Sequence, residues 1–122
     1  MPIKIKRIYE PYDPDDGWRV LVDRIWPRGV SKERAHLDEW RKELAPSTGL
    51  RDWFCHIPEK FAEFSIAYRT ELDNNPEIQE MIRQIVEKSK KSQVTLLYSA
   101  RDNEHNLAVV LRDYLNEKAG SV

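Results

Sequence analysis

The chain has 122 residues, of which 40% are hydrophobic and 34% charged, and its formal net charge at pH 7 is -1. These values are typical of one globular domain over residues 1–122, and the near-zero charge counts against a global basic field that would attract nucleic acid or lipid. The single cysteine excludes an intrachain disulfide. We find no apolar run of signal-peptide or membrane-span length, so we expect a cytoplasmic protein.

Two strands are predicted in the N-terminal third. Residues 3–9 alternate apolar and basic side chains, which indicates a half-exposed strand near a sheet edge, with Ile3, Ile5 and Tyr9 facing inward and Lys4 and Lys6 facing outward. A loop rich in Pro, Asp and Gly follows. Residues 18–25 then carry apolar side chains on two faces, with Leu21 and Ile25 together on one, which favours an interior strand.

The next segment contains a turn and short helices. Pro27 and Gly29 predict the turn, and Ser31 is expected to cap a helix. Residues 32–46 allow two interpretations: a helix, since three large apolar residues recur at helical spacing, or a short helical turn followed by a strand. Ser47 is expected to cap another short helix.

The C-terminal half is more regular. Apolar residues at three- and four-residue steps predict helices starting near Pro58 and at Pro76, and a third helix at the C-terminus. Residues 93–98 form a short apolar run that predicts a strand. This order predicts an α/β domain with a partly parallel sheet of about three to five strands flanked by helices and a ligand cleft at the strand ends.

A first candidate ligand-binding cluster follows the second strand. It comprises Asp23, Arg24, Arg28 and Gly29. Guanidinium groups suit phosphate or carboxylate, and ligands of open α/β sheets bind outside the carboxyl ends of the strands. The alternative is an Asp–Arg ion pair that only stabilises the turn.

A second cluster follows the last strand. Ser99, Arg101 and Asn106 are candidate ligand-binding residues, and Asp102 and His105 are candidate catalytic residues. Ser99 or Asp102 is expected to cap the helix, with His105 in its first turn, where the helix dipole favours a neutral imidazole. The alternative is an exposed capping segment. Parallel strands would bring both clusters to one edge of the sheet.

Other reactive residues receive structural interpretations. Cys55 is expected to pack as a small apolar residue, and His56 to shape the turn before Pro58. The histidines and the cysteine lack zinc-site spacing, so no metal or cofactor is expected. Tyr68 and Glu71 are further candidates for approaching the site from the third helix.

Three stretches carry a family resemblance. RVLVDRIWPRGVSKE, ELAPSTGLRDWFCH and VTLLYSARDNEHNLAVVL resemble the signature blocks of the YeaO-like family, a bacterial and archaeal domain of unknown function. The resemblance implies an α/β domain and no established activity. More distant relatives carry a cysteine-histidine-arginine triplet after the last strand. The matching positions here are Glu104, His105 and Asn106, of which only the histidine agrees.

These observations predict a protein that binds a small anionic ligand, phosphorylated or nucleotide-like. Arg24 and Arg28 would bind the anion, and Asp23 would orient an arginine. His105 with Asp102 would supply acid/base chemistry if the protein is an enzyme. The alternative is a non-catalytic regulatory or interaction module, for which the near-neutral charge counts against nucleic acid. The sequence indicates no oligomeric state.

Overall fold

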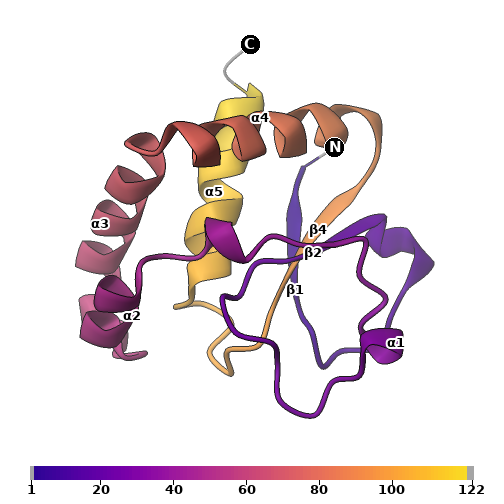
Figure 1. The fold of residues 1–122 in the computed structure, drawn as a ribbon, viewed down its shortest axis with the longest axis horizontal. Coiled ribbons are helices and arrows are strands. Elements are labelled where there is room, and N and C mark those ends of the chain that lie inside the picture. Colours follow the sequence, from indigo (N-terminus) through magenta and orange to yellow (C-terminus); the bar gives the residue numbers. More distant parts are fainter. Residues whose placement is uncertain (1, 121–122) are drawn as a thin grey trace.

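The computed structural model describes residues 2–120, and Figure 1 shows their fold. One four-stranded sheet has the order β1-β4-β2-β3, and every strand pair in it is parallel. Its strands are β1 (Lys4–Arg7), β2 (Trp18–Leu21), β3 (Glu39–Trp40) and β4 (Val94–Tyr98). The predicted α/β class is confirmed, and the sheet is wholly rather than partly parallel.

The helices fall into two groups. Short α1 (Lys32–Ala35) follows β2, whereas α2 (Thr48–Phe54), α3 (Phe61–Asp73), α4 (Pro76–Lys91) and α5 (Leu107–Gly120) follow β3 and β4. The predicted caps are confirmed at Ser31 and Ser47, and Asn75 caps α4 in the same way: each side chain accepts backbone N–H groups of the first helical turn. Pro58 opens a 3₁₀ turn (Pro58–Lys60) that leads directly into α3.

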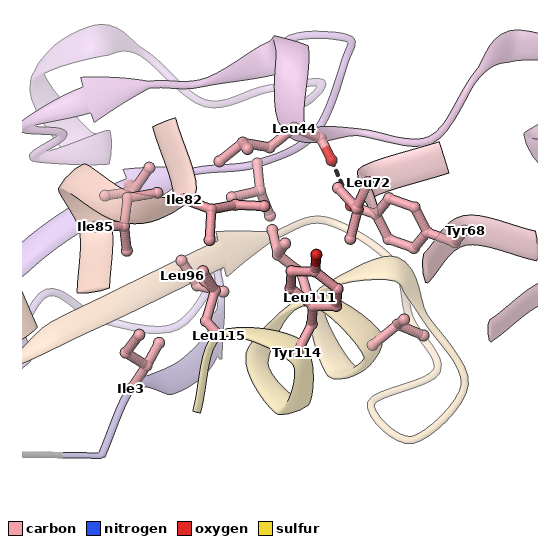
Figure 2. Close-up of a cluster of buried hydrophobic side chains, with 14 of the residues drawn as sticks. Ile3, Leu44, Tyr68, Leu72, Ile82, Ile85, Leu96, Leu111, Tyr114 and Leu115 are labelled. Atoms are coloured by element: carbon pink, nitrogen blue, oxygen red, sulfur yellow. Dashed lines mark hydrogen bonds between the residues drawn. The ribbon is translucent and has the colours of Figure 1, made fainter. Parts of the chain in front are cut away.

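The main core lies between the sheet and the four later helices. Figure 2 shows side chains of α3, α4 and α5, among them Leu72, Ile82 and Leu111, gathered around Leu96 of β4. All five residues of β4 are buried. Burial on both faces is typical of an interior strand of a parallel sheet, and β4 lies between β1 and β2.

The opposite face of the sheet has a thinner cover. Ile8, Leu21, Ala35 and Leu97 form a second, smaller buried cluster there, to which α1 and its flanking loops contribute. The chain therefore leaves β2 toward this face, through α1, and leaves β4 toward the other face, through α5. Because β2 and β4 are neighbours, their carboxyl ends form a topological switch point of the sheet.

Polar contacts fasten α1 to β2. Arg19 is 1% exposed, and it donates hydrogen bonds to the carbonyl oxygens of Ala35 and His36 and pairs with Asp16. Lys6 also pairs with Asp16, at 3.0 Å, so its side chain is half-buried rather than outward as expected. Burial raises the pKa of Asp16, but the hydrogen bonds from Lys6 and Arg19 outweigh this and hold it below its usual value.

Some expected positions are wrong because the strands are shorter than predicted. β1 ends at Arg7, where the side chain of Glu10 accepts the Arg7 N–H, and Tyr9 beyond it is 39% exposed instead of facing inward. β2 ends at Leu21, so Ile25 lies in the following turn and is 67% exposed.

For residues 32–46, the prediction of one continuous helix is wrong. A short helix followed by a two-residue strand is found instead.

Candidate functional site

A cleft of about 420 Å³ opens at the carboxyl ends of β2 and β4. Three stretches and one residue of α3 line it: residues 23–25 after β2, residues 46–56 around α2, residues 98–107 between β4 and α5, and Phe64. This volume is within the usual range for small-molecule sites, roughly 300–1,000 Å³.

Asp23 lines the cleft and connects the ends of β2 and β4. Its Oδ2 accepts a hydrogen bond from the backbone N–H of Ser99 at 3.0 Å, and Asp23 as a whole is only 8% exposed. Burial raises the pKa of Asp23, although the hydrogen bonds from Ser99 and the charges of Arg51 and His56 oppose the rise. Asp23 is therefore a carboxyl group held in an apolar setting beside positive charges.

Arg24 joins the cleft to the segment before α2. Its Nη2 donates to the carbonyl oxygens of Ala45 and Pro46, at 3.3 and 3.2 Å. Its Nε is buried and has no hydrogen-bond partner among the residues that the structure describes. A buried donor without a partner costs about 1–3 kcal/mol of stability, so Arg24 is held in this position at an energetic cost.

The α2 segment contributes Arg51, Cys55 and His56 to the lining. α2 ends at Phe54, and the two residues that follow it, Cys55 and His56, both adopt left-handed backbone conformations, with φ of 46° and 54°. Non-glycine residues rarely occupy this region, and strain of this kind accumulates at functional sites. The interpretation of Cys55 as a packed apolar residue is wrong, because its side chain is exposed at the cleft.

Contacts from α3 fix the position of the α2 wall. Tyr68 is fully buried and donates its hydroxyl hydrogen bond to the carbonyl oxygen of Leu44. Glu71 accepts from the N–H and the hydroxyl of Ser47, at 2.8 and 2.6 Å. Burial raises the pKa of Tyr68 far above its usual range, so it stays a hydrogen-bond donor. Tyr68 and Glu71 therefore support the cleft wall and do not belong to the cleft lining.

The segment between β4 and α5 differs from its prediction. α5 begins at Leu107, and Asn106 accepts the Val109 N–H at 3.1 Å, so Asn106 caps the helix in place of Ser99 or Asp102. His105 thus precedes the helix instead of lying in its first turn.

Asp102 and His105 form a local pair. Asp102 accepts the N–H groups of Glu104 and His105, and its Oδ2 lies 2.9 Å from Nδ1 of His105. These contacts, led by the Glu104 N–H, lower the pKa of Asp102. The His105 ring packs edge-on against Phe61, with 5.2 Å between ring centroids. Neither Asp102 nor His105 lines the cleft.

The structure brings part of the predicted site together. Four predicted residues line the cleft: Asp23, Arg24, Ser99 and Asn106. Arg28, Gly29 and Arg101 are exposed and lie outside the lining, and Gly29 provides a turn with φ of 78°.

Arg51, Asp52 and His56 were missed as site residues. They follow a predicted helix cap, but no pattern in the sequence indicates which part of the sheet that helix approaches.

Within residues 2–120, we find no group of three His, Cys, Asp or Glu side chains suited to a metal ion. In the same range, every helix is too short or too polar to cross a membrane.

Comparisons with known proteins give a family. The profile of a family described as "Inactive DUF488-N3 subclade" matches residues 2–121. The chain is 44% identical to "Uncharacterized protein YeaO" of Escherichia coli (strain K12) over 115 residues, 94% of this chain and 97% of the relative. It is 41% identical to "Uncharacterized protein Rv3073c" of Mycobacterium tuberculosis (strain ATCC 25618 / H37Rv) over 114 residues, 93% of each chain. No solved structure gives a significant match. The chain therefore belongs to the YeaO-like family, in the subclade that its profile describes as inactive.

Proposed function

We propose that the cleft binds a small molecule through an anionic group, such as a carboxylate or a phosphate. The observation that carries this proposal is that the side chains of two arginines, Arg24 and Arg51, line one cleft at the carboxyl ends of β2 and β4. His56 lines the same cleft. A guanidinium offers donors in a planar fork that matches carboxylate and phosphate oxygens.

The position of the cleft in the fold supports the proposal. In open α/β sheets, ligands bind outside the carboxyl ends of strands at the point where the connections leave toward opposite faces. β2 and β4 meet that description, and the cleft is lined by residues that directly follow each strand. The two left-handed residues in its wall, Cys55 and His56, agree with a functional role for this segment.

The proposed role is binding rather than catalysis. The candidate acid/base pair, Asp102 and His105, is hydrogen-bonded internally and lies outside the cleft lining. The family's description as inactive favours the same conclusion. A protein that binds a ligand without converting it would respond to that ligand as a regulator or carry it.

A ligand panel tests the proposal. Thermal unfolding of the full chain is measured with phosphate, sulfate, nucleotides, sugar phosphates and small carboxylates. A ligand at 100 times its dissociation constant should stabilise the protein by about 2.7 kcal/mol. Arg51→Gln should abolish the shift. It is preferred to an Arg24 variant because Arg24 also holds two backbone carbonyl groups.

Arg28→Gln is the matched control, since it makes the same change on an exposed arginine outside the cleft. The ligand-dependent shift should survive in this variant. A shift lost in Arg28→Gln and kept in Arg51→Gln would move the anion site away from the cleft. If no member of the panel stabilises the protein, the anion-binding proposal fails and a protein-interaction module becomes the better account.

A further inference from the structure

We infer that the ligand of the cleft is a zwitterion on an apolar body: an amino acid with an apolar side chain, whose ammonium group binds Asp23. The inference rests on the proposed function, because it assigns the ligand's carboxylate to the anion site at Arg24 and Arg51. It adds a second charge and a body to that ligand. Three features of the lining carry it.

The first feature is the burial of Asp23 without an ion pair. Among residues 2–120, no salt bridge is formed by Asp23, and the hydrogen bonds to its carboxyl group come from Ser99 alone, through the serine side chain and through the N–H that donates to Oδ2. A carboxylate removed from water is costly unless a cation or several donors compensate for the lost hydration. A bound ammonium group would supply that compensation.

The second feature is that the cleft presents charges of both signs without pairing them. Arg51 and His56 lie near enough to Asp23 for their charges to act on it, yet among the described residues neither forms an ion pair with it. A simple dianion such as phosphate would bring negative charge toward Asp23 as well as toward the arginines. A zwitterion instead places one charge against each sign.

The third feature is the apolar part of the lining. The same cleft that holds the charged groups is also lined by Ile25, Phe54, Phe64 and Leu107. Phe54 and Phe64 stack on each other, with 4.3 Å between ring centroids, and give this wall a rigid aromatic base. An apolar side chain would bury its surface there, whereas a sugar phosphate would bring hydroxyl groups to a wall with few partners for them.

Matched ligands test the inference on the wild-type protein. Calorimetric titrations compare L-phenylalanine with 3-phenylpropionate, which lacks the ammonium group, and with 2-phenylethylamine, which lacks the carboxylate. L-Leucine and 4-methylpentanoate form a second pair with a different apolar body. We expect at least one amino acid to bind about tenfold or more tightly than its deaminated partner, because a buried carboxylate discriminates strongly for a cation.

Two variants locate the effect. Asp23→Asn keeps an oxygen acceptor for the Ser99 N–H but removes the charge, so it should abolish the advantage of the amino acid over its deaminated partner. Asp15→Asn makes the same change on an exposed residue outside the cleft and should preserve that advantage. If Asp23→Asn does not fold, N-acetyl-L-phenylalanine, which has no ammonium group, replaces it as the test and should bind the wild type as weakly as 3-phenylpropionate.

The outcomes separate the two proposals. If deaminated carboxylates or phosphates bind as tightly as the amino acids, or bind alone, the zwitterion inference is overturned and anion binding stands. If no carboxylate, phosphate or amino acid binds, both fail. An amino-acid advantage that is kept in Asp23→Asn would also overturn the role given to Asp23.

Discussion

Asp23 combines a structural and a proposed binding role in one side chain. It hydrogen-bonds the backbone of Ser99 and so connects the ends of two neighbouring strands, and it also faces the cleft. Asp23 and Ser99 were both predicted from the sequence, because residues that follow parallel neighbouring strands must meet at one edge. The burial of Asp23 was not predicted, since it depends on the α2 wall that closes over it.

The raised pKa of Asp23 makes a prediction about stability. Its usual pKa is 3.8, and burial raises the value in the folded protein. A carboxyl whose folded pKa is raised contributes stability below its unfolded pKa, and this contribution is lost as the pH rises through the folded pKa. Asp23→Asn cannot ionise, so it should gain stability relative to the wild type as the pH rises from about 3.5 to 7.

Urea unfolding of both proteins across that pH range checks this expectation, with Asp52→Asn as the control. The Asp52 variant should show no comparable trend, because its side chain is exposed. The opposite result would be a wild type whose free energy of unfolding rises relative to that of Asp23→Asn as the pH increases. It would mean that hydrogen bonds and charges already stabilise the ionised carboxylate in the ligand-free protein. That result would remove one support for a cationic ligand group.

At the scale of elements, α2 decides the shape of the site. Glu71 of α3 accepts hydrogen bonds from Ser47 at the N-terminus of α2, and Tyr68 of α3 donates to the carbonyl oxygen of Leu44 in the segment before α2. These contacts join segments 24 residues apart in sequence. Local patterns predicted α2 and its cap but could not predict these tertiary contacts. For this reason Arg51 was missed and Arg28 was favoured.

The end of α2 offers a stability prediction. Cys55 occupies the left-handed position that glycine adopts most easily after a helix. Cys55→Gly should therefore be more stable than Cys55→Ala by about 1 kcal/mol, since both remove the thiol but only glycine relieves the backbone strain. Chemical denaturation of the two variants measures the difference. Equal stabilities would show that the left-handed conformation costs little here.

At the scale of the whole molecule, the order of the strands creates the cleft. The class of the fold was predictable because alternating apolar strands and amphipathic helices imply a parallel sheet. The chain leaves β2 toward one face of the sheet and β4 toward the other. This difference was not predictable, because it depends on which strands become neighbours. α1 is too short to cover the second face alone, so the turn containing Pro27 is folded against it through Trp26 and Val30. That packing leaves Arg28 exposed, outside the cleft.

The central claim is that Arg24 and Arg51 bind the anionic group of a ligand in this cleft. Its most direct measurement is NMR of the arginine Nε–H groups while the wild-type chain is titrated with inorganic phosphate and with small carboxylates. We predict saturable shifts of the Arg24 and Arg51 resonances, with those of Arg28 and Arg101 unchanged. Saturable shifts at Arg28 or Arg101, with Arg24 and Arg51 unaffected, would contradict the account.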